Sequence, residues 1–476
     1  MRKFYFLAII LTSLTLNIAA QSGRVGPTQQ VPVSAEVSLL NERTAWELFS
    51  EVDAYDKKKF AEFEAKKIPF NNELYQKTLL EKRQMAAKYA AILSEREGQT
   101  GTDLYYLGML HWIAINAESA ERAFEKFLAE PEPDAEKAQT ARSNLVIIAA
   151  QKKNFDKAEK FLGQYLQGEP VRTKERARME DELARNYRAA KMPESAAQHA
   201  REAYLGIKTV FPEIKSRIDA INNLLNAGML VFEIYSEMDR PKQAEAALED
   251  LRREAAEYQS TSLYYYALNE HIKYLIEIGR KPEALEMYSK FLSQSVREFK
   301  TKPLQEDILR RLKKREKHYK LLGETAPELV NIGNFVEGQP GIISTMRGKV
   351  ILLDFWATWC GPCIDAFPAL IEWHETFEKD GLEILGITRY YGRIGSVPAD
   401  QASEMQSLQE FKKEYRLPYD FVVADNDANQ RTYGALSLPT TVLIDRKGIV
   451  RYVETGTSQS RENEIRQEII KLLAEK

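Results

Sequence analysis

The sequence predicts a multidomain chain in which an all-α helical-repeat region is followed by an α/β domain. Three observations support this fold class. Apolar residues recur at helical spacing between residues 39 and 322, where glycine and proline are sparse. A continuous apolar run at residues 349–358 predicts a strand buried on both faces, as at the centre of an α/β sheet. The only two cysteines of the 476 residues, Cys360 and Cys363, follow that strand directly.

The N-terminus has the three parts of a secretory signal. Met1–Lys3 is basic, an apolar stretch begins at Phe4, and Ala20 offers the small residue that signal peptidase accepts. Residues 1–20 are therefore predicted to be a signal peptide, which places the protein in the periplasm or elsewhere outside the cytoplasm. An uncleaved membrane anchor is the alternative, although polar residues interrupt the apolar run before it reaches the length of a span. Contact with a membrane is expected only if the segment stays attached.

A short tether follows the signal. Residues 21–38 contain Gly23, Gly26, Pro27 and Pro32 and lack any periodic pattern, so they are predicted to form a flexible linker. The formal net charge of the whole chain is −3. This mild acidic balance does not favour nucleic-acid binding, which requires a basic face.

Residues 39–322 show weak internal repetition. An alanine followed by apolar residues four and seven positions later recurs at intervals of roughly 40 residues, and proline precedes three of the five alanines where a helix can begin. The pattern resembles degenerate tetratricopeptide-type (TPR-like) helical hairpins, and an irregular α-solenoid is the alternative. Such arrays recruit peptides or proteins, although a spacer or dimerisation role fits the pattern nearly as well. The five sets are Ala120/Phe124/Phe127, Ala158/Leu162/Tyr165, Ala196/Ala200/Ala203, Ala244/Leu248/Leu251 and Ala284/Tyr288/Phe291.

The cysteine pair lies where the buried strand gives way to a predicted helix beginning near Ala366. A thiol at a helix N-terminus faces unpaired N–H groups that stabilise its thiolate, so Cys360 is the predicted nucleophile. Zinc is the alternative use of a Cys-x-x-Cys pair, but it needs four ligands. Only His374 of the five histidines is near in sequence, so we expect no metal site.

The segment Phe355-Trp356-Ala357-Thr358-Trp359-Cys360-Gly361-Pro362-Cys363 resembles the active site of the thioredoxin superfamily. Thr325-Ala326-Pro327, Arg347-Gly348-Lys349 and the stretch Tyr433–Gly448 match further motifs of its TlpA-like and ResA-like extracytoplasmic thiol-disulfide oxidoreductases. The resemblance covers residues 323–476 and implies a thioredoxin-like α/β fold there.

The resemblance also implies the roles of the site residues. Cys360 and Cys363 would form a redox-active disulfide, and the Leu438–Pro439 peptide bond would be cis and lie beside it. Neither a metal nor an organic cofactor is implied. The residues implied to contact substrate are Trp359, Gly361, Pro362, Leu438 and Pro439.

The chain departs from the ResA-like pattern at two positions. ResA-like enzymes carry glutamate three residues after the second cysteine, where this chain has Ala366. The second departure is Asp354, which matches the buried aspartate of thioredoxin itself, whereas many relatives of the extracytoplasmic branch have asparagine at this position. A carboxyl group in an apolar strand has a raised pKa, so Asp354 is the candidate base that activates Cys363. A carboxylate held by backbone hydrogen bonds is the alternative.

The preferred function is an exported thiol-disulfide oxidoreductase that reduces protein disulfides, with exported proteins or a redox partner protein as its partners. The Gly361-Pro362 dipeptide between the cysteines favours reduction over oxidation. One alternative is a helical-repeat scaffold whose thioredoxin-like domain is an interaction module. A peroxidase is a weaker alternative, because it would need threonine where Ala357 stands. The long segment at residues 389–398 either contacts substrate or is a solvated loop.

Overall fold

The computed structural model describes residues 40–338 and 343–475. The predicted signal peptide (residues 1–20) and linker (residues 21–38) lie outside the described residues. The chain forms two compact units. The first comprises residues up to Ile148 together with Glu159–Pro170, and the second comprises Ala149–Ala158 and Val171–Lys476.

The first unit is helical, as the sequence predicts. Its helices begin at side-chain caps: Thr44 and Glu47 form a capping box at the start of α2, and Asn71 and Asn116 cap α3 and α5. Helices α2, α3 and α4 pack against one another around a buried apolar cluster. The helices are α2 (Ala45–Ala65), α3 (Asn72–Ser94), α4 (Thr102–Ile113) and α5 (Ala117–Leu128), and both α6 (Ala135–Gln151) and α7 (Phe155–Gln167) are divided between the two units.

The second unit continues with seven more helices, each packed against the next from α8 to α14, and α12 also contacts α14. Pro193 and Pro241 are the first residues of α9 and α11, and Pro282 is in the first turn of α13, as the sequence predicts. The helices are α8 (Thr173–Ala189), α9 (Pro193–Val210), α10 (Arg217–Glu237), α11 (Pro241–Glu257), α12 (Thr261–Glu277), α13 (Lys281–Glu298) and α14 (Lys302–Leu321), with the short helix η1 (Phe211–Glu213) after α9.

The alanine sets fall on alternate helices, namely α5, α7, α9, α11 and α13. All fifteen residues of these sets are buried. The recurring alanine therefore marks the face that each of these helices packs against its neighbours. The helical nature of the region is confirmed, whereas its kinship with tetratricopeptide repeats stays a prediction.

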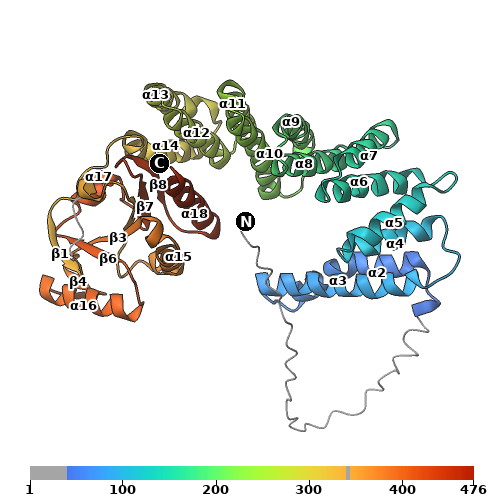
Figure 1. Cartoon of the computed structure of the whole chain (residues 1–476), viewed down its shortest axis with the longest axis horizontal. Coiled ribbons are helices and arrows are strands. Elements are labelled where there is room, and N and C mark those ends of the chain that lie inside the picture. Colours follow the sequence, from blue (N-terminus) through green and yellow to red (C-terminus); the bar gives the residue numbers. More distant parts are fainter. Residues whose placement is uncertain (1–39, 339–342, 476) are drawn as a thin grey trace, which may run out of the picture. The chain divides into compact units, whose positions relative to one another are not determined.

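The C-terminal part of the second unit is a six-stranded mixed sheet with strand order β1-β6-β3-β2-β7-β8 (Figure 1). Strands β2, β3 and β6 are parallel, and β1, β7 and β8 join them in antiparallel pairs. Every residue of β2 is buried, as predicted for the central run. The strands are β1 (Ile332–Val336), β2 (Val350–Phe355), β3 (Leu382–Arg389), β6 (Asp420–Ala424), β7 (Thr440–Ile444) and β8 (Val450–Thr455), and β4 (Arg393–Ile394) pairs with β5 (Val397–Pro398) in a separate small hairpin.

Helices cover both faces of the sheet. One apolar cluster joins the sheet to α15, α16 and α18, and it contains both cysteines. The cluster on the opposite face includes Tyr433 of α17, Ile343 of η2 and the residues Leu321 and Leu322 at the end of α14. The last helix of the helical region is therefore part of the core beneath the sheet. These elements are α15 (Gly361–Phe377), α16 (Gln401–Glu414), α17 (Ala428–Tyr433), α18 (Gln459–Ala474), η2 (Ile343–Met346) and η3 (Glu378–Asp380).

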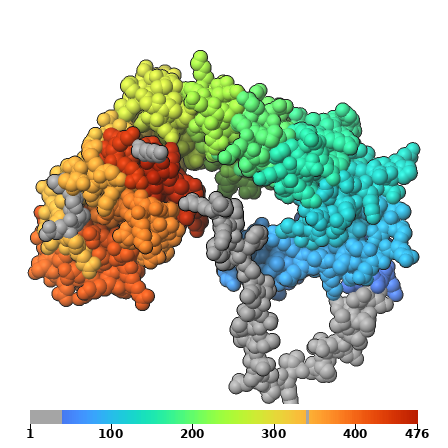
Figure 2. All heavy atoms as spheres, in the orientation of Figure 1, coloured from blue at the N-terminus to red at the C-terminus, as the bar shows by residue number. Residues whose placement is uncertain are grey.

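Polar contacts also join α14 to the α/β elements. Arg315, only 5% exposed, donates two hydrogen bonds to the Glu454 carboxylate at 3.0 and 2.8 Å. His318 Nδ1 lies 3.0 Å from an Nη atom of Arg315, and its Nε2 lies 3.0 Å from the carbonyl oxygen of Gly434. Because arginine can only donate, Nδ1 accepts and Nε2 carries the hydrogen that binds Gly434. Figure 2 shows the red C-terminal part of the chain next to the yellow part, in line with these bonds. The domain boundary between residues 322 and 323 stays a prediction.

Candidate active site

The two cysteines form a disulfide at the N-terminus of α15, with their Cα atoms 5.2 Å apart. Cys360 is the N-cap residue of the helix, and the backbone N–H of Cys363 donates to its sulfur at 3.3 Å. This N–H and the positive end of the helix dipole would also stabilise a thiolate on Cys360 after reduction of the disulfide. The local structure thus supplies the electrostatic environment that the sequence predicts for a nucleophile.

The two cysteines differ in access, since Cys360 is 5% exposed and Cys363 is not exposed at all. Cys360 lines a cleft of about 560 Å³, whereas Cys363 is fully buried beneath it. Trp359, next to Cys360, is 49% exposed at the mouth of this cleft. A substrate in the cleft could therefore reach Cys360 but not Cys363.

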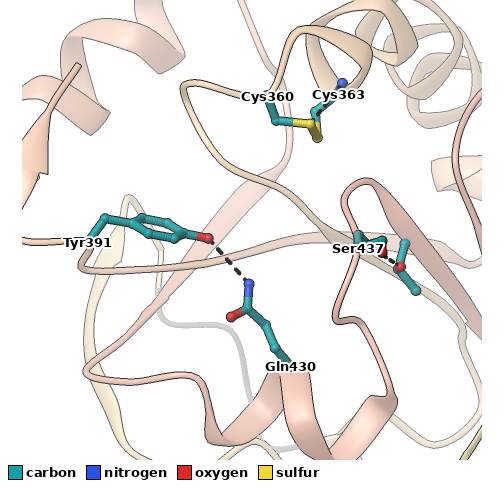
Figure 3. Close-up of a disulfide and its surroundings, with 6 residues drawn as sticks. Cys360, Cys363, Tyr391, Gln430 and Ser437 are labelled. Carbon is teal, nitrogen blue, oxygen red and sulfur yellow. Dashed lines mark hydrogen bonds between the residues drawn. A yellow bond between two sulfur atoms is a disulfide. The ribbon is translucent and has the colours of Figure 1, made fainter. Parts of the chain in front are cut away.

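The far side of the cleft is the loop that precedes β7. The Leu438–Pro439 peptide bond is cis, as expected. The Thr440 hydroxyl donates to the Ser437 carbonyl oxygen at 2.6 Å, and the N–H of Gly456 donates to the Pro439 carbonyl oxygen at 2.8 Å. These bonds fix the loop opposite the disulfide, and Figure 3 shows Ser437 across from the two cysteines.

The structure brings most of the predicted substrate-contacting residues to one place. Trp359, Gly361, Pro362 and Leu438 line the cleft together with Cys360. Pro439 follows Leu438 but is not part of the lining. The predicted substrate-binding role of these residues stays a prediction.

Asp354 is buried on β2, with a side chain only 2% exposed. Asp354 is two positions from both Leu352 and Trp356 and therefore lies on the same face of the sheet as they do. Because these two residues belong to the apolar cluster that contains the cysteines, the carboxyl group points to the Cys363 side of the sheet. Burial alone raises the pKa of Asp354 to about 7. A carboxyl group with this pKa can exchange a proton near neutral pH, which is the property expected of the base. Burial raises the pKa of Tyr419 in the same cluster well above its ordinary value, and the charge of Asp354 adds to this effect.

Several cleft residues were not among the predicted site residues. Arg389 is the last residue of β3 and Tyr391 follows it, both in the segment 389–398 for which the sequence left a solvated loop as one interpretation. Gln430 and Asp427 come from α17 and its N-cap, and Figure 3 shows the Gln430 amide and the Tyr391 hydroxyl directed at each other below the disulfide. No local sequence signal marks α17 as part of the site, because only the tertiary fold places it there.

The described residues contain no group of three or more His, Cys, Asp or Glu side chains arranged to hold a metal ion. The prediction that the protein needs neither metal nor cofactor is not tested by this observation. Within residues 40–338 and 343–475, no helix combines the length and apolar character needed to cross a bilayer.

Comparison with known proteins agrees with this geometry. The AhpC/TSA family matches residues 322–453. The thiol-disulfide oxidoreductase ResA of Geobacillus thermodenitrificans (strain NG80-2) is 32% identical over 142 residues, which are 30% of this chain and 74% of the relative. The ResA of Geobacillus kaustophilus (strain HTA426) is 32% identical over 156 residues, 33% of this chain and 82% of the relative. The chain belongs to the ResA family of thiol-disulfide oxidoreductases.

Among solved structures, a thiol:disulfide interchange protein of the thioredoxin family from Chlorobium tepidum TLS is 22% identical. The match covers 32% of this chain and 97% of that protein, with a TM-score of 0.26. The ResA relatives account for about a third of this chain.

Proposed function

We propose that this ResA-family protein is exported and reduces disulfide bonds in other proteins, with Cys360 as nucleophile and Cys363 as the resolving thiol. The observation that carries the proposal is the asymmetry of the pair. Cys360 lies in the cleft at the N-terminus of α15, while Cys363 is buried on the side of the sheet to which Asp354 points.

The reaction follows from thiol chemistry. The Cys360 thiolate attacks one sulfur of a substrate disulfide, so that a mixed disulfide forms and one substrate thiolate leaves. Cys363 loses its proton to Asp354 and attacks the Cys360 sulfur. This step forms the Cys360–Cys363 disulfide and releases the second substrate thiolate, so two electrons pass from the enzyme to the substrate. An external dithiol must then reduce the enzyme for the next cycle.

Reduction of insulin disulfides by dithiothreitol tests the activity. We expect the full chain to accelerate the reaction and Cys360→Ser to abolish the acceleration. Equal rates for the two proteins would refute the enzymatic proposal and would favour the scaffold alternative.

We further propose that the helical region recruits the substrate or redox partner. Residues 39–170 contain the described part of the first unit and all of α2 to α7, whereas α14 belongs to the second unit and contributes to the core beneath the sheet. A variant that lacks residues 39–170 should therefore keep its activity on insulin but capture fewer exported proteins as mixed disulfides. Capture of the same proteins in the same amounts would refute a recruiting role for the deleted helices.

A further inference from the structure

The segment after β3 is a fixed wall of the cleft. Glu404 of α16, only 6% exposed, accepts hydrogen bonds from the backbone N–H groups of Tyr391 and Gly392, both at 2.8 Å. The N–H of Ala399 donates to the Gly392 carbonyl oxygen at 3.0 Å and closes the loop around the β4–β5 hairpin. These bonds tie both ends of the segment down beside the cleft, while residues 392–398 between them are exposed, so the choice between substrate contact and a solvated loop stays a prediction.

The wall presents two guanidinium groups among aromatic rings. The guanidinium carbon of Arg389 lies 4.1 Å from the centre of the Tyr391 ring, and its Nε donates to the Gln430 side-chain oxygen at 3.1 Å. The Tyr391 ring packs edge to face against Trp359, with 5.4 Å between the ring centres. The guanidinium carbon of Arg393 lies 5.8 Å from the centre of the Trp359 ring. One arginine is therefore held in place within the cleft lining, and the second borders it from the exposed hairpin.

The positive charge of this wall is not neutralised within the described part of the chain, where no carboxylate forms an ion pair with Arg389 or Arg393. The one acidic residue of the cleft lining is Asp427, and its carboxylate pairs with Arg431 at 2.5 Å. Glu404 is occupied by the two backbone N–H groups and stabilises the loop. An anionic group that enters the cleft would thus meet the Arg389 guanidinium in the lining, and Arg393 would approach it from beyond the exposed Trp359 ring.

We propose that Arg389 and Arg393, with the Trp359 and Tyr391 rings, form a subsite for an acidic side chain next to the attacked cystine of a protein or peptide substrate. This inference rests on the proposed function of Cys360. Arginine suits such a site because its planar guanidinium donates several hydrogen bonds to a carboxylate and stacks on aromatic faces. The subsite would select substrates by charge, while the cysteines supply the chemistry.

The test uses three cystine peptides that differ only in one residue beside a cysteine, which is Glu, Gln or Lys. The pre-reduced full chain is mixed with each peptide in single-turnover experiments, and the second-order rate constant is measured. We expect the Glu peptide to react roughly five- to tenfold faster than the Gln peptide, because a close charge pair in a partly solvated cleft contributes about 1 kcal/mol or slightly more. The Lys peptide should be slowest, and 0.5 M salt should compress the differences.

Arg393→Gln, at an exposed position, should reduce the ratio of the rate constants for the Glu and Gln peptides at least twofold. The double variant that also carries Arg389→Gln should bring this ratio close to one. Lys379→Gln is the control, because Lys379 follows the far end of α15, about 25 Å along the helix axis from Cys360. It should leave the ratio unchanged. Equal rates for the three peptides, or a ratio that survives in Arg393→Gln and the double variant, would overturn the subsite. Failure to reduce any peptide would instead count against the proposed function.

Discussion

Replacement of Asp354 by asparagine should stabilise the protein, and more so at high pH. The folded-state pKa of Asp354 is about 7, above its ordinary value of 3.8, because the carboxyl group is buried. The folded state therefore holds a proton between these two pH values that the unfolded state has lost, and stability falls as pH rises through this window. Below pH 3.8 the buried carboxyl group is protonated in both states and does not lower the stability, whereas above pH 7 the cost of its buried charge is present.

The size of the penalty follows from the two pKa values. One pKa unit corresponds to about 1.4 kcal/mol, so the desolvated carboxylate costs about 4 kcal/mol at pH 8 but only about 2 kcal/mol at pH 5. Asparagine has the shape of the protonated acid and carries no charge. The gain in unfolding free energy in Asp354→Asn should therefore be about 2 to 3 kcal/mol larger at pH 8 than at pH 5.

Chemical denaturation followed by tryptophan fluorescence measures this difference, since Trp356 is buried in the same cluster. The disulfide should be intact in both proteins. Asp365→Asn, at an exposed position on α15, is the control and should change stability little at either pH. A gain that is the same at pH 5 and pH 8 would refute the argument that Asp354 is a buried acid that titrates near neutrality.

The Asp354→Asn variant should also be the slower enzyme, because Cys363 would lose its base. The lifetime of the mixed disulfide should lengthen about tenfold or more.

Two further predictions concern the contact between α14 and the α/β core. Glu454→Gln should lower the unfolding free energy by about 3 kcal/mol, because it leaves the buried Arg315 guanidinium of α14 without its carboxylate. Glu316→Gln, which removes an exposed ion pair on the same helix, is the control and should lower it by less than about 1 kcal/mol. Similar losses in the two variants would contradict the reasoning. Gly434→Ala should destabilise the protein more than Gly456→Ala. Both glycines have positive φ, but a Cβ at Gly434 would lie 2.7 Å from His318, whereas one at Gly456 would meet nothing within 4 Å. Equal melting temperatures for the two variants would contradict a tight contact there.

Local pattern was sufficient to predict much of the fold. The buried run of β2, the strand-to-helix junction at Cys360 and the helix-starting prolines are short-range features, and the structure has them where they were expected. The cis bond before Pro439 was implied by resemblance and is present. These features depend on residues close together in the chain.

The contacts that the sequence did not reveal join residues far apart in the chain. Arg315 meets Glu454 across 139 positions, and neither residue carries a local sign of being buried. Arg389 and Gln430 meet across 41 positions at the edge of the cleft. Hydrophobic periodicity reports which face of an element is buried, but it does not report which element covers that face. For this reason the role of α14 beneath the sheet emerged only from the structure. The sequence offered residues 389–398 as a possible substrate contact, but not the contact of Arg389 with Gln430 of α17.

The division of labour between the two cysteines is the central claim, and trapping of the mixed disulfide tests it most directly. Cys363→Ser, mixed with a cystine substrate, should accumulate a covalent complex through Cys360 that dithiothreitol releases. Cys360→Ser should form no such complex, because the remaining thiol is fully buried. A complex that forms through Cys363, or in equal amounts with both variants, would contradict the account.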